Sequence, residues 1–257
     1  MPENKKASLR HRLLAGESVF GPFLKIPASA PAELIAYAGF DFCVIDLEHS
    51  PFSFERAEDI VRAAQGAELS TVIRAFDRQP STLSRCLDTG CEALLVPNIE
   101  TRQEAEQVVS GARFHPLGRR GMDPRARSAR YGTIPSSIYF GPEMDPPLLA
   151  LQIEGLRGIE NLDDILEVDG FDLVFIGPYD LSQSMGMPGE VNAPPVLART
   201  REIVASVKAR GKVVGIYADK VEEACRWRDL GIQFVATCVD VHLFYTACEA
   251  MVKALHA

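Results

Sequence analysis

The sequence predicts an α/β protein, a single (β/α)8 TIM barrel that occupies residues 1–257. Three observations lead to this prediction. Eight short apolar runs alternate with helical segments, which is typical of parallel βα units, and eight such units close a barrel. A chain of 257 residues has the usual length of this fold. No Ser/Gly-rich linker divides the chain into smaller domains.

The predicted strands are apolar runs rich in Val, Ile, Leu and Phe. The second run, Phe42-Cys43-Val44-Ile45, is apolar without alternation and stops abruptly at charged residues. Continuous apolar runs of this kind indicate strands that are covered on both faces, as in a parallel sheet. The strands are predicted at residues 19–26, 42–47, 71–74, 93–96, 148–154, 171–176, 213–217 and 234–237.

The predicted helices begin at recognisable capping residues. Ser8 and Ser53 are suited to N-caps, and Thr101 with Glu104 forms a capping-box pattern. The last helix has a broad apolar face. The helices are predicted at residues 8–14, 31–38, 53–64, 81–88, 101–109, 161–166, 195–209, 221–230 and 240–255.

The alternation breaks once, at residues 111–147, where prolines and glycines surround a basic cluster. A connection of this length in a compact domain is usually functional or an interface. Two interpretations stay open: an anchor for the phosphates of an acyl-CoA, or a solvated or subunit-interface loop. The cluster consists of Arg119, Arg120, Arg125, Arg127 and Arg130.

Composition excludes several classes of function. A net charge of −8 argues against nucleic acid, which requires a basic surface. No apolar run is long enough to span a membrane, and the polar, basic residues 1–12 are not expected to form a secretory signal. The six cysteines form no CxxC pair, which favours buried thiols in a reducing compartment. We therefore expect a cytoplasmic protein.

Polar side chains gather where the predicted strands end. The C-terminal ends of parallel barrel strands meet at one mouth, where active sites are built. The opposite ends are predicted to carry nothing comparable. The predicted mouth residues are Asp46, Glu48, His49, Arg74, Asn98, Gln152, Glu154, Tyr179 and Asp180.

Glu154 and Asp180 are the predicted metal ligands. Each follows a strongly apolar strand, where an unpaired carboxylate is costly. Carboxylates without nearby cysteines or a histidine pair favour Mg²⁺ or Mn²⁺ over zinc. The alternative is that one of the two carboxylates forms a structural ion pair with Arg74.

The remaining mouth residues suit proton transfer and anion stabilisation. His49 can take or give a proton near neutral pH, and a neighbouring carboxylate can orient it. Arg74 can stabilise an oxyanion. Residues 177–180, Gly-Pro-Tyr-Asp, read as a tight turn whose backbone N–H groups can hold a carboxylate. The chain has no GxGxxG, Walker or GxSxG motif.

Five motifs stand in a consistent order and spacing. They are Asp46-Leu47-Glu48-His49, Arg74, Leu95-Val96-Pro97, Gln152-Ile153-Glu154 and Phe175-Ile176-Gly177-Pro178-Tyr179-Asp180-Leu181-Ser182. On these motifs the chain, from about Leu13 to the C-terminus, resembles the HpcH/HpaI aldolase family, the class II pyruvate aldolases of the phosphoenolpyruvate-binding barrel superfamily.

The resemblance implies a divalent metal on Glu154 and Asp180, chelated by a 2-oxo acid. It implies that His49 and Asp46 form an acid–base dyad acting through water, and that Arg74 binds the substrate carbonyl oxygen. Further implied roles are substrate binding by Gln152 and by the backbone at Tyr179 and Asp180, and ordering of metal-bound water by Glu48. Family members are typically hexamers, trimers of dimers that exchange the last helix, here residues 240–255.

The chain also departs from the family pattern. Leu47 stands where a glycine is common, and Tyr179 stands where a small residue is common. An aromatic residue common early in the first strand corresponds to Phe23. Because a tyrosine at the metal turn reshapes the pocket, the acceptor preference of family members cannot be transferred to this chain.

The expected function is that of a class II, metal-dependent aldolase. It would cleave or form 4-hydroxy-2-oxo acids through a pyruvate enolate and an aldehyde. One alternative is a citrate synthase-like condensation of an oxaloacetate-derived enolate with an acyl-CoA or another acceptor on the same metal site. Two others are a Schiff-base aldolase, for which Lys25 is the candidate lysine, and a sensor that binds oxo acids without turnover.

Overall fold

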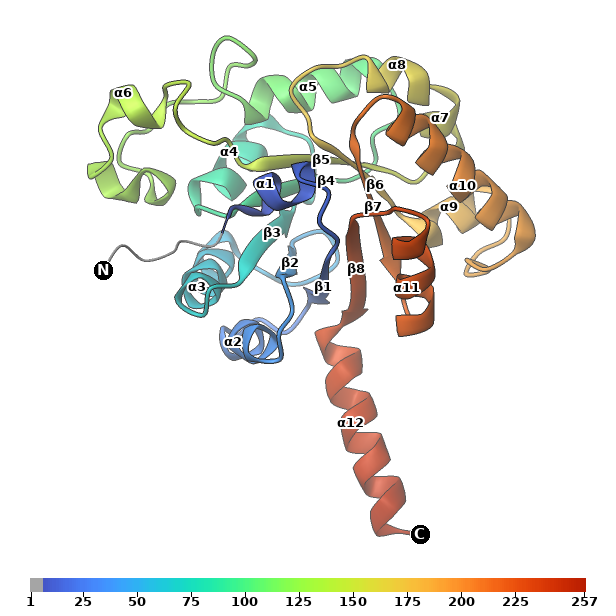
Figure 1. The fold of residues 1–257 in the computed structure, drawn as a ribbon. Coiled ribbons are helices and arrows are strands. Elements are labelled where there is room, and N and C mark those ends of the chain that lie inside the picture. Colours follow the sequence, from blue (N-terminus) through green and yellow to red (C-terminus); the bar gives the residue numbers. More distant parts are fainter. Residues whose placement is uncertain (1–6) are drawn as a thin grey trace.

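Eight parallel strands form a closed barrel in the order β1 to β8 (Figure 1) in the computed structural model, which describes residues 7–257. The first six residues, part of the segment expected not to be a secretory signal, lie outside the described residues. The predicted (β/α)8 barrel is confirmed. The strands are β1 (Val19–Leu24), β2 (Phe42–Asp46), β3 (Ser70–Arg74), β4 (Ala93–Val96), β5 (Leu148–Ile153), β6 (Leu173–Ile176), β7 (Val213–Ala218) and β8 (Phe234–Val239).

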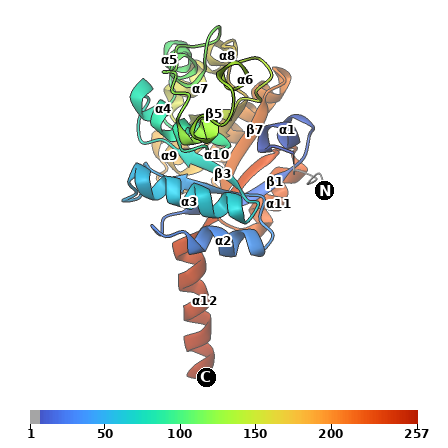
Figure 2. The ribbon, with the colours of Figure 1, turned by 90° about the vertical axis from the view of Figure 1, so that its left-hand side faces the viewer.

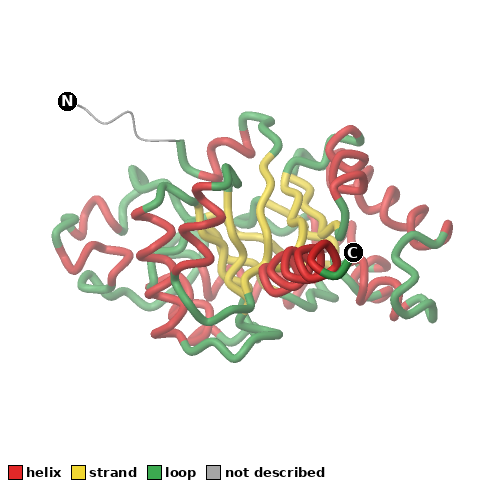
Figure 3. Tube along the Cα trace, turned by 90° about the horizontal axis from the view of Figure 1, so that it is seen from below, coloured by secondary structure: helices red, strands yellow, loops and turns green. Residues whose placement is uncertain are grey.

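Helices surround the barrel on its outer face (Figure 3). The predicted N-caps Ser8 and Ser53 and the capping box of Thr101 and Glu104 are all present. The helices are α1 (Leu9–Leu14), α2 (Ala30–Tyr37), α3 (Phe54–Gly66), α4 (Pro80–Asp88), α5 (Arg102–Ala112), the 3-10 helix η1 (Arg127–Gly132), α6 (Ser136–Tyr139), α7 (Leu156–Glu160), α8 (Leu162–Leu166), α9 (Pro178–Ser184), α10 (Pro194–Ala209), α11 (Val221–Asp229) and α12 (Asp240–Leu255).

Large aromatic side chains fill the barrel interior. The ring of Phe42 stacks on that of Phe234 at a centroid distance of 4.2 Å, and Phe175 meets Phe234 edge-on at 6.0 Å. Gly215 makes room for these rings, because a Cβ atom at this position would press against the rings of Phe175 and Phe234. The packed interior means that chemistry is confined to the ends of the barrel.

Carboxylates at the base of the barrel were not predicted. The expectation that the N-terminal strand ends carry nothing comparable to the mouth is wrong, because Asp41, Glu92 and Asp172 each directly precede a strand. Their side chains accept hydrogen bonds from backbone N–H groups at this end of the barrel. Asp41 accepts from the N–H of Phe20 at 2.9 Å, and Asp172 accepts from the N–H of Leu149 at 2.9 Å. Their role is to satisfy buried backbone donors, which would otherwise destabilise the fold.

Arg113 is the buried cation of this basal network. It donates to Asp172 at 2.8 Å and to the carbonyl oxygens of Gly170 and Pro147 at 2.7 and 2.6 Å. Arg10 binds the other oxygen of Asp172 at 2.9 Å.

Replacing Arg113 by methionine is expected to lower the free energy of unfolding by about 3 kcal/mol, because it leaves a nearly buried carboxylate with one cation. The kcat of the folded fraction should not change, since Arg113 lies at the opposite end from the mouth. Chemical denaturation at fixed protein concentration measures the first quantity. Arg157→Met, which breaks an exposed pair with Glu100, is the control and should cost less than about 1 kcal/mol. An Arg113→Met protein as stable as the control would contradict the assignment of Arg113 as a stabilising buried cation at the base.

The arginine-rich connection lies at the base of the barrel, because it links α5 to the beginning of β5. Its contacts confirm this position: Arg120 donates to Asp88 at the end of α4, and Arg127 to Gln65 near the end of α3. Part of it folds into η1 and α6. It therefore lies at the opposite end from the mouth of its own barrel.

Helix α12 leaves the barrel instead of folding back along it (Figure 2). Asp240 is its only residue that is buried, and it accepts the backbone N–H groups of Lys25 and Ile26 at 2.9 Å. Many of the remaining apolar side chains of the helix are exposed: Val241, Leu243, Phe244, Tyr245, Met251, Val252 and Leu255. Within residues 7–257, no helix is long and apolar enough to cross a membrane.

Candidate active site

The carboxyl ends of β2 and β3 join Asp46 to Arg74. The two residues are partners in the parallel register, and both side chains are buried. Arg74 donates Nε and Nη2 to the two Asp46 oxygens at 2.9 and 2.8 Å, a bidentate pairing. Although burial opposes ionisation, this pairing holds the pKa of Asp46 below its usual value. The guanidinium also lies 4.9 Å from the centre of the Phe23 ring.

Glu48, and not Asp46, is the carboxylate next to the His49 ring. Glu48 Oε2 lies 3.9 Å from His49 Nε2 and 3.1 Å from Arg74 Nη1. Burial raises the pKa of Glu48, whereas Arg74 acts to lower it. The side chain of His49 is exposed on the rim of the mouth.

Among the described residues, the His49 ring makes no direct contact with the Asp46 carboxylate, so the dyad that the resemblance implies, which acts through water, stays a prediction. Asp46 is bound by Arg74 and by backbone donors. Its Oδ1 accepts the N–H groups of Glu48 and His49, both at 3.2 Å. The Asp46 carboxylate therefore contacts the backbone of His49 and also orients the side chain of Arg74.

Lys25 stands at the end of β1 as an ion-pair partner. Its Nζ lies 3.7 Å from Asp46 Oδ2 and donates to the carbonyl oxygen of His49 at 3.4 Å. These contacts make Lys25 part of the ion-pair network of Asp46, whereas a Schiff-base lysine requires a desolvated, unpaired amine.

Gln152 and Glu154 lie side by side at the end of β5. The Gln152 amide donates Nε2 to Glu154 Oε2, and the backbone N–H of Asn98 donates to Glu154 Oε1 at 3.0 Å. Gly177 keeps this space open, because a Cβ atom there would collide with Glu154 Oε2. The Oε1 atom of Gln152 is buried without a hydrogen-bond partner among residues 7–257.

Glu154 and Asp180 together suit a divalent cation. Burial raises the pKa of Glu154 to about 7, and the charge of Asp180 adds to the rise. A cation relieves both effects, and carboxylate oxygens are its preferred ligands. The described residues contain no cluster of three or more His, Cys, Asp or Glu positioned for a metal. Neither carboxylate pairs with Arg74 within the described chain, whose ion pairs there are to Asp46 and Glu48.

The segment expected to be a tight turn is the first turn of α9. Pro178 is its first residue, and Tyr179 and Asp180 follow on the exposed side. The Tyr179 hydroxyl donates to Asp219 at 2.5 Å, and Tyr217 donates to the other Asp219 oxygen at 3.0 Å. The hydrogen bond to Asp219 raises the pKa of Tyr179 to about 12.

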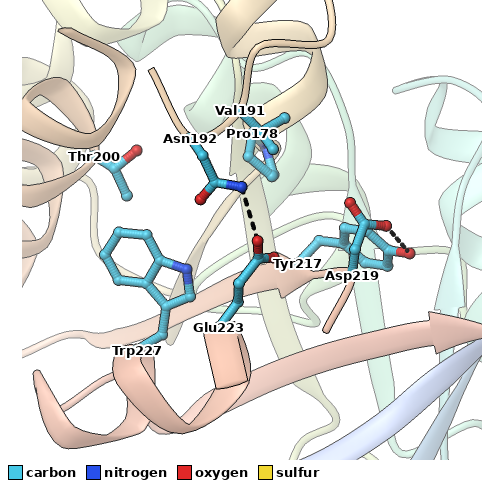
Figure 4. Close-up of a pocket in the computed structure, with 8 residues that line it drawn as sticks. All are labelled: Pro178, Val191, Asn192, Thr200, Tyr217, Asp219, Glu223 and Trp227. Atoms are coloured by element: carbon cyan, nitrogen blue, oxygen red, sulfur yellow. Dashed lines mark hydrogen bonds between the residues drawn. The ribbon is translucent and has the colours of Figure 1, made fainter. Parts of the chain in front are cut away.

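A small hollow lies behind this tyrosine pair, between α10 and α11 (Figure 4). Its volume is about 10 Å³, about the room that one water needs. Tyr217 and Asp219 reach it from the mouth, and Asn192 donates to Glu223 across it at 2.7 Å. None of the residues predicted for catalysis or metal binding lines it.

Asn98 and Asp219 belong to the mouth without a role predicted from the sequence. Asn98 was placed at the end of its strand, but its bonds to Glu48 and Glu154 depend on a left-handed backbone with φ of 57°. The available signal was its residue type, since asparagine adopts this conformation more readily than most residues. Asp219 directly follows β7. A polar residue at the end of a strand was also the signal that identified the other mouth residues.

Comparisons with known proteins extend over nearly the whole chain. A family model described as HpcH/HpaI aldolase/citrate lyase matches residues 20–247. The chain is 36% identical over 242 residues to a protein of Rhizobium etli named pyruvate aldolase, covering 94% of each chain. It is 37% identical over 238 residues to 2-keto-3-deoxy-L-rhamnonate aldolase of Klebsiella pneumoniae, covering 92% of this chain and 88% of that protein.

Solved structures match to a similar extent. The structure of an HpcH/HpaI aldolase/citrate lyase family protein from Burkholderia cenocepacia matches with a TM-score of 0.91 and 29% identity, covering 97% of this chain and 99% of that chain. The structure of the citrate synthase SbnG matches with a TM-score of 0.85 and 29% identity, covering 97% of each chain.

Proposed function

Because the chain belongs to the HpcH/HpaI aldolase/citrate lyase family and is an aldolase, a carbon–carbon lyase, we propose that it cleaves 4-hydroxy-2-oxo acids to pyruvate and an aldehyde. The observation that carries this proposal is the mouth of the barrel. There the ends of β2 and β3 supply a fixed guanidinium beside an exposed histidine. The end of β5 and the start of α9 supply two carboxylates with no cationic side chain paired to either among residues 7–257.

We assign a divalent cation, Mg²⁺ or Mn²⁺, to Glu154 and Asp180. Bound there, it would act as a Lewis acid toward the oxo acid. Gln152, through its amide, and the backbone at Tyr179 and Asp180 are proposed to hold the oxo acid beside these carboxylates. The proposal is supported by the elevated pKa of Glu154 and by the unpartnered Oε1 of Gln152.

The remaining residues are proposed to handle charge and protons. Asp46 fixes the plane of Arg74, whose remaining N–H groups then face a developing negative charge on oxygen. His49 takes the proton of the C4 hydroxyl as the C3–C4 bond breaks. Glu48 lies beside His49 Nε2 and is placed to stabilise its charged form and to order a water molecule.

Metal removal is the experiment that tests this function. Enzyme stripped with EDTA is expected to release no pyruvate from 4-hydroxy-2-oxo acids, and added Mg²⁺ or Mn²⁺ should restore release. Undiminished release from stripped enzyme would contradict the metal assignment and point to Lys25. Borohydride with pyruvate is the matching control and should leave the protein unmodified.

A citrate synthase-like condensation is the second candidate, favoured by the similarity to SbnG. The basal position of the arginine-rich connection weighs against it, because that segment cannot reach acyl-CoA at the mouth of its own barrel. Release of CoA thiol from acetyl-CoA and oxaloacetate, without pyruvate release from hydroxy-oxo acids, would favour this candidate. Turnover in either assay excludes a sensor that only binds.

We propose that α12 packs on a second copy of the chain, as part of a hexamer built from dimers. The supporting observation is that apolar side chains are exposed both on α12 and on the helices beside its N-terminal end. Leu34 and Tyr37 of α2 are 67% and 76% exposed, and Val221 of α11 is 66% exposed. Exposed apolar side chains that gather in one region are typical of interaction sites. The thiols, of which Cys43, Cys86 and Cys91 are buried, support a cytoplasmic location.

Introducing glutamates at Phe244 and Met251 of α12 is expected to break up the oligomer, because charges cannot be buried unpaired in an apolar interface. Light scattering after size exclusion should show a smaller mass with an unchanged far-UV spectrum. Lys253→Glu on the same helix is the control. An unchanged mass for Phe244→Glu/Met251→Glu would contradict the proposed exchange.

A further inference from the structure

Asn98 lies between the proposed acid–base group and the proposed metal ligands. Its Nδ2 donates to Glu48 Oε1 at 3.3 Å, and its backbone N–H donates to Glu154 Oε1 at 3.0 Å. One residue at the end of β4 thus contacts a carboxylate from the β2 side and a carboxylate from the β5 side. Nothing in the assigned chemistry uses it so far.

The backbone around Asn98 is fixed by its neighbours. Arg78 donates to its carbonyl oxygen at 2.6 Å, and the next N–H group, of Ile99, donates to the carbonyl of Gln152 at 3.1 Å. Asn98 has a φ of 57°, a left-handed conformation that costs energy for residues other than glycine but is tolerated best by asparagine and aspartate. In this conformation, the N–H and the side chain point to different carboxylates.

The two carboxylate oxygens of Glu48 have different neighbours. Within residues 7–257, Asn98 is the hydrogen-bond donor to Oε1 of Glu48. The other oxygen, Oε2, is buried and forms no aligned hydrogen bond there, although it lies 3.1 Å from Arg74 Nη1 and 3.9 Å from His49 Nε2. A donor on Oε1 sets the rotation of the carboxylate, and therefore sets which oxygen faces the guanidinium and the imidazole.

We propose that Asn98 is a positioning residue for the aldol cleavage: its amide holds the Glu48 carboxylate so that Oε2 faces Arg74 and His49. The inference rests on the proposed function and adds a residue to it. The expected effect of losing the amide is on kcat, since the Asn98 side chain donates to Glu48 and not to a proposed metal ligand among the described residues. Its backbone N–H should continue to support Glu154 in any variant that keeps the turn.

Asn98→Gly separates the amide from the backbone, because glycine adopts the left-handed conformation without strain. The variant should be at least as stable as the wild type and should bind Mn²⁺ with unchanged affinity by calorimetry. Its kcat for pyruvate release should fall about tenfold, the factor for one hydrogen bond to a charged group, with little change in KM. Asn98→Ala should show the same kcat with a lower Tm, because alanine is strained at this φ.

A double-mutant cycle with Glu48→Ala, which removes the acceptor of the Asn98 amide, shows whether Asn98 acts through Glu48. If it does, adding Asn98→Gly to Glu48→Ala should lower kcat little further. A full tenfold loss in the Glu48→Ala background, a normal kcat for Asn98→Gly alone, or weakened Mn²⁺ binding by Asn98→Gly would each overturn the inference. Exchange of the C3 protons of pyruvate with D₂O provides a second readout that needs no aldehyde. A wild-type protein inactive in both assays would overturn the proposed function as well.

Discussion

Replacing Arg74 by alanine is expected to lower kcat by about 10²–10³-fold, the effect of losing one preorganised oxyanion donor. The same substitution should lower the free energy of unfolding by about 3–5 kcal/mol, because the fully buried Asp46 loses its bidentate partner. Steady-state kinetics and urea denaturation, at one protein concentration, measure the two effects separately.

Arg74→Lys distinguishes charge from geometry. Lysine restores the positive charge near Asp46 but lacks the planar fork that satisfies both oxygens. Part of the stability should return, while kcat should stay well below that of the wild type. Arg113→Met provides the comparison at the base, where a buried cation is lost without any effect expected on kcat. An Arg74→Ala enzyme with near-normal kcat would show that the guanidinium has no part in the reaction.

Replacing Glu154 by glutamine is expected to abolish the response to metal. One of the two proposed carboxylate ligands is lost, and kcat/KM at saturating Mg²⁺ should fall by about 10³-fold, since a Lewis acid contributes several kcal/mol. The metal-free variant should be as stable as the metal-free wild type or more so. The reason is that burial already disfavours the ionised form of Glu154, whose pKa is raised to about 7. Thermal denaturation with and without Mg²⁺ measures the response to metal and the stability of the metal-free protein. Steady-state kinetics measure kcat/KM.

Glu92→Gln is the matched control for this variant. Glu92 accepts the N–H of Leu9 and the hydroxyl of Ser70 at the base of the barrel, both at 3.1 Å. Its loss should lower stability and leave the metal-induced rise in Tm intact. If Glu154→Gln retained a normal rise in Tm with Mg²⁺, the cation would have to be placed elsewhere.

All eight strands and most of the helices were predicted, including the five-residue α8. Residues 240–255 were predicted as a helix, and the structure has the same bounds. The short helices α7 and α9 were missed. A helix of five or seven residues shows little periodicity, and both begin after a glycine that provides no side-chain cap. Within the arginine-rich connection, η1 and α6 were missed for the same reason of length.

The gathering of polar residues at the mouth was predictable because parallel strands all end on the same side. The pairing between them was not, since the partner of Asp46 depends on the register that places it beside Arg74. The basal carboxylates were overlooked, although acidic residues directly before three strands, Asp41, Glu92 and Asp172, were a visible signal. The roles of Asp46, Glu48, His49 and Arg74 remain predictions that the variants above test.

The outward course of α12 separates two events in refolding. All eight strands pair within one chain, so the barrel itself can close at a rate independent of protein concentration. Burial of the apolar face of α12, whose side chains beyond Asp240 stay accessible in a single chain, requires an encounter between chains. Under the proposed exchange, refolding should therefore show a first-order phase followed by a second-order phase, and the yield of assembled protein should rise with concentration.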